Sequence, residues 1–335
     1  MGNIFTSEVQ LGREGTAGNE VNATQKWRGP AGFLDEQQTL VFVDEHIGSI
    51  PGKDRTYIPQ VLTGIAFPDT PATFEQLTTL FAAGIQDDTP AADGGGSGKI
   101  YFYQPPVDNV QPDETFIKTY TIESGDSEAA EVATYCVPAE FTLAGAMGEA
   151  LMVSSTWFGR QAAPGAFTGA LSLLAVEDIL TQKGTLFIDN AGSLGNTQIT
   201  NVISQFDLSV KTGWQPRFTA DGELFYSKAT YTHPEILLNI VFEHEAQAIA
   251  EKVLMRAQTA RSIRLTFDGS ALASAGTTYT FKTLQIDLAG KWETFDTISE
   301  SDGVSEVAAT FRARDNDTEN MFAKFIVVNE NAGYP

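Results

Sequence analysis

The stretch DGGGSGKIYF, residues 93–102, is the segment most suggestive of chemistry, because a glycine run that ends in Gly-Lys is typical of a phosphate-binding loop. That signature requires a glycine five positions before Gly98 and a Ser or Thr after the lysine, but these positions hold Asp93 and Ile100. A phosphate-binding loop also opens a helix, whereas KIYFY reads as a strand. We therefore interpret Gly94–Gly98 as a mobile Gly/Ser connector without nucleotide chemistry, and its role stays open.

The three histidines, His46, His233 and His244, form no recognisable metal-binding or catalytic set. Glu243 and Glu245 flank His244, but the zinc-protease pattern requires a second histidine at position 248, which this chain lacks. We interpret this segment as a charged junction between a strand and a helix.

Neither the single cysteine nor the carboxylates single out a catalytic group. Cys136 lies among small and apolar neighbours in ATYCVPA, which favours a buried small hydrophobe over a nucleophile. Adjacent carboxylates are numerous, and we interpret them as solvated surface: Asp44-Glu45, Asp87-Asp88 and Glu177-Asp178. No Gly-x-Ser-x-Gly elbow is present. The sequence therefore predicts no catalytic residue, no cofactor site and no metal site, and the protein is not expected to be an enzyme.

The charge balance restricts the partners. Forty-three acidic and 21 basic residues give a net charge of −22, and the acids are spread along all 335 residues. Such a surface repels nucleic acid and anionic membranes. No apolar run approaches the roughly 20 residues of a membrane helix. The acidity indicates either simple solubility or a surface that must lie near DNA without binding it.

The sequence contains an internal repeat. Three pairs of segments share one offset of 145 positions: FVDEHIGSIPG (from Phe42) with FIDNAGSLGN (from Phe187), YTIESG (120–125) with LTFDGS (265–270), and FTLAG (141–145) with IDLAG (286–290). A repeat at fixed spacing indicates duplicated structural units. A fourth pair, VSSTWFGR (153–160) and VAATFRAR (307–314), has an offset of 154, so we expect nine extra residues in the turn around KWETFDTISESDG of the second copy.

Both copies have the same expected elements. Alternation of apolar and polar residues predicts strands, as in 206–211, where Phe206, Leu208 and Val210 face one way and Asp207, Ser209 and Lys211 the other. One amphipathic helix is expected in each copy, at 70–84 after Thr70-Pro71 and at 246–257, where Ala246, Ile249, Ala250, Val253 and Ala257 have helical spacing.

These elements predict a mainly β (α+β) chain with two tandem β-barrel or sandwich domains, each with one flanking helix. We expect a polar N-terminal arm with little core-forming content at residues 1–24 and a first copy at 25–167. A linker with a helical turn or two is expected at 168–184, followed by a second copy at 185–335.

At KWRGPAGFLDEQQTLVFVDEHIGSIPG (26–52) and in the segment from TFDGSALASAG to TFRARDN (266–316), the chain resembles the tail tube proteins of long-tailed phages. The resemblance covers most of residues 26–328 and implies a virion structural protein whose rings stack into a tail tube, a conduit for DNA ejection. It implies contacts with itself, a tape-measure protein, and tail terminator and tail-tip proteins. It also implies transient non-specific passage of double-stranded DNA, no membrane contact, and synthesis in the bacterial host cytoplasm.

The doubled length departs from the many relatives with one tube domain, which are expected to form rings of six. Two copies in one chain predict a ring of three chains; six chains, with the second copy outside the tube, is the competing arrangement. A different function also fits the composition: an acidic β-rich carbohydrate-binding module or hydrolase, which would bind its ligand in a cleft and remain monomeric.

Overall fold

Antiparallel strands supply most of the regular structure in the computed structural model, which describes residues 4–30, 32–200 and 202–334. Two α-helices and two short 3-10 turns complete the regular elements of this described part. The prediction of a mainly β fold is confirmed.

The first half of the chain contains these elements: η1 (Ile4–Thr6), β1 (Glu8–Arg13), β2 (Gln25–Lys26), β3 (Asp35–Gln38), β4 (Val41–Phe42), β5 (Thr56–Tyr57), β6 (Val61–Pro71), α1 (Gln76–Gly84), β7 (Ala91–Ala92), β8 (Lys99–Tyr103), β9 (Tyr120–Gly125), β10 (Ala130–Ala146), β11 (Met152–Gly159) and β12 (Ala163–Gly165).

The second half contains η2 (Thr181–Lys183), β13 (Gly184–Asn190), β14 (Gln198–Ile199), β15 (Ile203–Lys211), β16 (Trp214–Arg217), β17 (Lys228–Tyr231), β18 (Glu235–Glu243), α2 (Ala246–Arg256), β19 (Arg261–Ala271), β20 (Phe281–Phe295), β21 (Ser299–Ser301), β22 (Val304–Ala313) and β23 (Ala323–Asn329).

Eight strands form one continuous antiparallel strip, in the order β3-β6-β11-β10-β15-β18-β22-β20. The pairing of β10 with β15, from Glu140–Lys211 to Ala146–Gln205, joins the two halves of the chain. The strip ends at β3 on one side and at the C-terminal part of β20 on the other. We call this sheet the eight-stranded strip.

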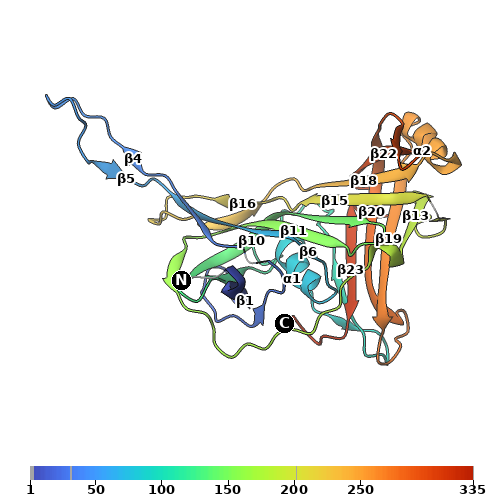
Figure 1. Ribbon diagram of the computed structural model, residues 1–335, viewed down its shortest axis with the longest axis horizontal. Coiled ribbons are helices and arrows are strands. Elements are labelled where there is room, and N and C mark those ends of the chain that lie inside the picture. Colours follow the sequence, from blue (N-terminus) through green and yellow to red (C-terminus); the bar gives the residue numbers. More distant parts are fainter. Residues whose placement is uncertain (1–3, 31, 201, 335) are drawn as a thin grey trace.

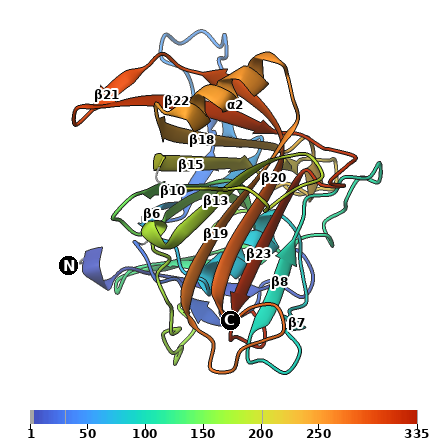
Figure 2. The same cartoon turned by 90° about the vertical axis from the view of Figure 1, so that its right-hand side faces the viewer.

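Two further groups of strands cross the strip, and Figure 2 shows the second group running steeply across β15 and β18. They are built on the N-terminal parts of the same two long strands, β10 and β20. Their orders are β2-β1-β9-β10-β12 and β14-β13-β19-β20-β23-β8-β7. The buried core lies between the strip and these crossing strands, with α1 inside it.

The strand pairings of the first half recur in the second. The pairs of neighbouring strands in the first half are β1-β2, β1-β9, β9-β10, β10-β11, β10-β12, β11-β6 and β6-β3. Their counterparts in the second half, in the same order, are β13-β14, β13-β19, β19-β20, β20-β22, β20-β23, β22-β18 and β18-β15. A helix follows β6 and its counterpart β18. We call these the first and second sets of strands.

The matching positions differ from those expected at an offset of 145. Phe187 lies in β13, a strand paired on both edges, whereas Phe42 lies in the two-stranded β4–β5 arm. Phe141 pairs with β11 and β15, whereas Ile286 pairs with β19 and β23. These two sequence anchors are therefore wrong, because short apolar motifs recur at non-equivalent places along strands that share one periodicity. The third, YTIESG with LTFDGS, does lie in corresponding strands, β9 and β19.

The bulges in the long strands establish an offset of 154 instead. In β10 the register shifts between Pro138 and Glu140, and in β20 between Trp292 and Thr294. Pro138 pairs with Trp157 and Trp292 pairs with Phe311, nineteen positions later in each case. The two final hairpins therefore agree in length up to the bulge, so the nine extra residues do not lie in that turn.

The additional length lies in the preceding hairpin. Strands β9 and β10 turn tightly, with Gly125 paired to Ala130. Strands β19 and β20 continue their pairing as far as Ala271 and Phe281 before they turn. Turn length is tolerant of change because it leaves the core undisturbed, and here this tolerance applies to the β19–β20 hairpin.

The two helices differ in burial. Residues 76–84 of α1 are all buried, and Phe81 contacts Tyr103, Phe141 and Phe325. Thr70 and Pro71 belong to the end of β6, so the expected helix start is wrong by several residues. In α2 only Ala248 and Glu251 are buried.

A buried ion pair holds α2 to the sheet. Both oxygens of Glu251 accept hydrogen bonds from Arg261, at 2.6 Å from Nη2 and 3.0 Å from Nε. Trp292 Nε1 donates to Glu251 Oε2 at 2.9 Å. Because Ile249 and Val253 are about half exposed, this ion pair replaces the apolar contact that their spacing predicted.

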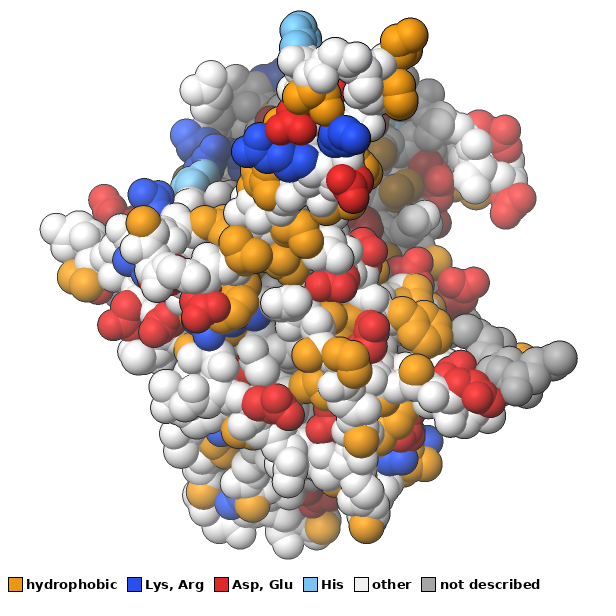
Figure 3. Space-filling model, turned by 90° about the vertical axis from the view of Figure 1, so that its left-hand side faces the viewer, with side chains coloured by type: hydrophobic (Ala, Val, Ile, Leu, Met, Phe, Trp, Pro, Cys, Tyr) orange, Lys and Arg blue, Asp and Glu red, His pale blue; other side chains and the backbone are white. Residues whose placement is uncertain are grey.

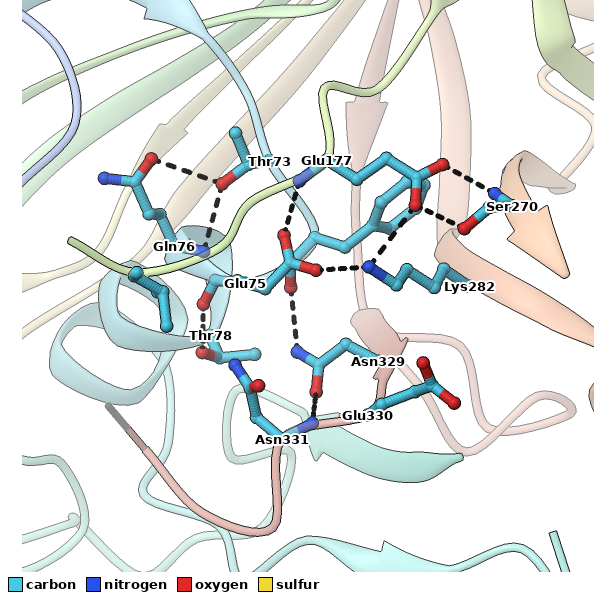
Figure 4. Close-up of polar contacts among 12 residues, drawn as sticks. Thr73, Glu75, Gln76, Thr78, Glu177, Ser270, Lys282, Asn329, Glu330 and Asn331 are labelled. Carbon is cyan, nitrogen blue, oxygen red and sulfur yellow. Dashed lines mark hydrogen bonds and ion pairs between the residues drawn. The ribbon is translucent and has the colours of Figure 1, made fainter. Parts of the chain in front are cut away.

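The linker is mainly extended and joins the two sets through polar contacts (Figure 4). Buried Glu75, just before α1, accepts bonds from Lys282 Nζ at 2.7 Å and from the backbone N–H of Glu177 at 2.9 Å. Glu177 in turn accepts bonds from the backbone and hydroxyl of Ser270. The helical turn or two expected in the linker is represented by the 3-10 turn Thr181–Lys183.

The glycine connector is attached to the second half. Strand β8 begins at Lys99, as predicted. The Asp93 carboxylate is buried and accepts bonds from the backbone N–H groups of Thr278 and Tyr279, at 2.9 and 2.7 Å. The N–H of Ser97 donates to the carbonyl of Ser274 at 3.0 Å. The prediction of a loop without fixed contacts is therefore wrong.

Part of the expected N-terminal arm also belongs to the core. Strand β1 pairs with β9 along six positions, and Val9 and Leu11 are almost completely buried. The expectation of little core-forming content is wrong for residues 8–13, because two apolar side chains at alternate positions suffice for an edge of the core.

We predict that Glu251→Ala lowers the free energy of unfolding by about 3–5 kcal/mol, because it leaves the buried Arg261 guanidinium without its carboxylate. Urea denaturation followed by circular dichroism measures this loss. Glu245→Ala, an exposed change at the start of the same helix, should cost below about 1 kcal/mol. Equal losses in both variants would contradict the ion pair's role.

Candidate functional site

The eight-stranded strip has one apolar and one polar face. Phe206, Leu208 and Val210 of β15 are buried, and Asp207 and Ser209 lie on the opposite face. The predicted alternation of this strand is confirmed. The same pattern continues through β10, β18 and β22, because neighbouring side chains of paired strands lie on the same side of a sheet.

Small and hydroxyl side chains occupy much of the polar face. Thr142 faces Ser209, and Asn239 faces both Asp207 and Thr310 across the ladder. The Thr310 hydroxyl donates to Asn239 Oδ1 at 2.8 Å. This face lacks the close-packed apolar patch of a permanent interface, so it is suited to contact with solvent or with a polar ligand.

Two of the three cations on the described part of this face are bound to carboxylates; the third, Lys291, is exposed and lies across the ladder from Arg312. Lys211 Nζ lies 2.8 Å from Glu235 Oε2 and pairs across the strand with Glu140. Arg312 forms ion pairs with Glu235 and, at 2.7 Å, with Glu293. A cation already held between carboxylates is a poor partner for phosphate, since binding would break existing charge-assisted hydrogen bonds.

Further along the same face the carboxylates are close to one another. The pKa of Asp207 is raised by burial and by the neighbouring charge of Asp69, against a hydrogen bond from Asn239. The upward direction of this pKa reflects the burial of Asp207 and its repulsion from the neighbouring carboxylate. The arrangement can repel a polyanion and offers no built anion site.

The residues first considered for chemistry are dispersed. His46 lies beyond β4, His233 precedes β18, and His244 lies between β18 and α2. Among the described residues no group of three His, Cys, Asp or Glu side chains is arranged to hold a metal ion. Cys136 is buried, as predicted, and burial raises the pKa of its thiol well above the usual value.

The adjacent carboxylates are not simply solvated. Asp87 forms an ion pair with Arg13, and Asp88 accepts a bond from the backbone of Phe102 at 2.7 Å. Burial would raise the pKa of Glu177, but its bonds from Ser270 and Lys282 outweigh this and lower it. The surface interpretation is therefore wrong for these three residues, because sequence adjacency says nothing about partners distant in the chain.

An arm projects from the body at residues 39–60. It contains the short β4–β5 pairing and extends far from the sheets (Figure 1). Its exposed apolar side chains include Phe42, Ile50 and Tyr57. Figure 3, which looks onto this end of the molecule, shows apolar and charged side chains together there. Exposed aromatic and aliphatic groups on a projecting segment indicate a contact with another molecule.

One cavity of about 360 Å³ lies between β13, β15 and β19. Phe206, Phe267 and Leu186 line its apolar part, and its polar lining consists of Thr and Gln side chains. No carboxylate or histidine belongs to this lining, so it lacks the acid and base of a glycoside hydrolase.

No protein-family model matches the sequence, and no curated protein matches it. No helix in the described part of the chain is both long and apolar enough to cross a membrane.

We predict that Glu235 keeps its charge in acid, because hydrogen bonds from Lys211 and Arg312 lower its pKa to about 2. Its stabilising contribution should be fully present above its ordinary pKa of 4.5 and lost as the pH falls toward 2. The difference in unfolding free energy between the wild type and Glu235→Gln, measured across this range, should shrink with decreasing pH. A difference independent of pH would contradict the assignment.

Proposed function

We propose that this chain is a structural protein of a phage virion. Its copies assemble into rings, and stacked rings form a tail tube through which double-stranded DNA passes. The observation that carries the proposal is the eight-stranded strip, which has a polar face on which Lys211 and Arg312 are paired with carboxylates. It ends at two strand edges that have no strand partner among the described residues. The tape-measure protein and the terminator and tail-tip proteins are the remaining proposed partners.

The charge of the polar face suits a conduit. Free Lys and Arg side chains would bind DNA at successive sites with dissociation constants of about 10⁻⁴ to 10⁻⁶ M, and transit would stall. Here Lys211 and Arg312 are neutralised by Glu235 and Glu293. Glu140 and Asp207 lie on the same face, so its carboxylates still outnumber its cations when the exposed Lys291 is included. The duplex is then repelled from the wall on every side.

The size of the strip favours three chains in each ring. Eight strands from each of three chains supply 24, and at a spacing of about 4.8 Å these span a barrel of about 37 Å diameter before strand tilt widens it. Barrels of 16–18 strands already enclose an aqueous channel. The projecting arm, with Phe42 and Ile50 exposed, is the segment we assign to contacts between successive rings.

Negative-stain microscopy of the purified full-length protein tests the proposal directly. We expect rings or tubes with a central opening, and three chains per ring in a reconstruction. Monodisperse single particles that bind saccharides would overturn it in favour of the carbohydrate-binding alternative. Six chains per ring, with the second set of strands outside the tube, would contradict the three-chain arrangement alone.

We predict that Ser209→Lys makes assembled tubes retain double-stranded DNA, because it adds a cation to the polar face in every copy. Filter binding at about 50 mM salt should show at least a tenfold rise, with a steeper loss as salt increases. Asn109→Lys, on an exposed loop, is the charge-matched control. Equal retention by both variants would contradict the assignment of this face to the lumen.

A further inference from the structure

The junction between the two sets of strands is itself a strand pairing. Residues 140–146 of β10 pair with residues 205–211 of β15, antiparallel and without interruption. Strand β10 reaches this partner only after its bulge at Ala139, beyond the end of its pairing with β9. The first set therefore uses the C-terminal part of its long strand, β10, to pair with β15, the strand of the second set that comes next in the eight-stranded strip.

The second set has the same edge without an occupant. The two bulges match at an offset of 154 positions. By this offset, residues 140–146 of β10 correspond to residues 294–300, which include the end of β20 and the start of β21. Thr294 and Phe295 pair with Thr310 and Ala309 of β22, and Ser299 and Glu300 pair with Glu306 and Ser305, so the register shifts by one residue between the two segments. Within the described residues no strand pairs with the opposite edge, and Asp296, Ile298 and Glu300 are exposed.

The first set has the complementary unoccupied edge. Strand β6 corresponds to β18, since Ile65 pairs with Trp157 as Leu238 pairs with Phe311. Its neighbour β3 therefore corresponds to β15, with Asp35 at the place of Ser209. Within the described residues β3 pairs only with β6, and residues 35–38 are exposed.

We propose that β3 of one chain pairs with the β20–β21 edge of a second copy of this chain, in the register of the internal β10–β15 junction. This inference rests on the proposed ring assembly and specifies its contact. The pairs transferred from the internal junction are Gln37 with Thr294, Glu36 with Phe295 and Asp35 with Asp296. Leu34 and Phe33 then lie beside residues 297–299, where the register to β22 shifts by one residue.

The side chains on these edges support this occupant. Phe33 is 47% exposed and Ile298 is 55% exposed in the single chain. The register places both at the same end of the contact, where an aromatic and an aliphatic side chain can pack together across the two edges. Backbone N–H and C=O groups along both edges gain the partners that an open sheet lacks.

One pair in this register is unfavourable. Asp35 and Asp296 carry like charges and lie opposite one another, which weakens the contact. Replacing one of them by a cation should therefore strengthen assembly. This direction of change separates the proposed register from general damage to the fold, which would only weaken assembly.

The register is tested by cross-linking the full chain with Asp35→Cys and Asp296→Cys together, a pair that precedes the register shift. Opposed Cβ atoms in a ladder lie about 4.5–5.5 Å apart, close to the spacing of a disulfide. Mild oxidation should link chains into species of up to three. Each single variant should give none, since Cys136 is buried. The pair Glu36→Cys with Ile298→Cys, which is out of this register, should link far less.

Microscopy of the same samples separates the two proposals. Rings without cross-links would overturn the register while leaving the tube function intact. Cross-links that continue to six chains would support the register and contradict the three-chain ring. If neither rings nor cross-links form, both proposals are overturned.

Replacing Asp296 by lysine provides a second measurement of the register. Asp296→Lys should lower the protein concentration required for assembly by about two- to fivefold, from the size of a cross-strand ion pair. Combining it with Asp35→Lys should remove the gain, because the two positions then carry like charges again. Asp317→Lys, an exposed change away from the edge, is the matched control. Equal gains from Asp296→Lys and Asp317→Lys would overturn the register.

Discussion

The change of partners along β10 and β20 is the constraint on which the rest of the structure depends. Each strand is long enough to serve two sheets, and each has a bulge soon after the point where its partners change. A bulge bends the strand and increases its twist. The crossing strands can therefore cover one face of the strip, and the core forms between them.

This geometry also explains the difference between the two faces of the strip. The covered face must be apolar, and Phe141, Leu208 and Phe311 are almost completely buried there. The opposite face has no covering layer within the chain and carries Ser, Thr and Asp side chains. Its ion pairs, such as Arg312 with Glu293, are half-exposed, so they hold side chains in place more than they stabilise the fold.

The two sets of strands are joined by groups that belong to neither repeat pattern. Glu75, Glu177 and Lys282 connect the start of α1, the linker and the β19–β20 hairpin (Figure 4). Asp93 connects the glycine loop to the same hairpin. These contacts add to the β10–β15 pairing and so hold the two sets of strands in one arrangement.

The sequence by itself determined the mainly β class, the buried face of β15, the strand after the glycine run and the existence of both helices, because side-chain periodicity reflects local geometry. The sequence also matched β11 with β22 at the offset of 154 that the bulges confirm. Only the tertiary structure decided how most other strands correspond, since alternation is identical at every register. It also decided that α2 is held by Glu251 and Arg261, and that Asp93 anchors the glycine loop. These contacts join residues distant in the chain, and no local pattern encodes such partners.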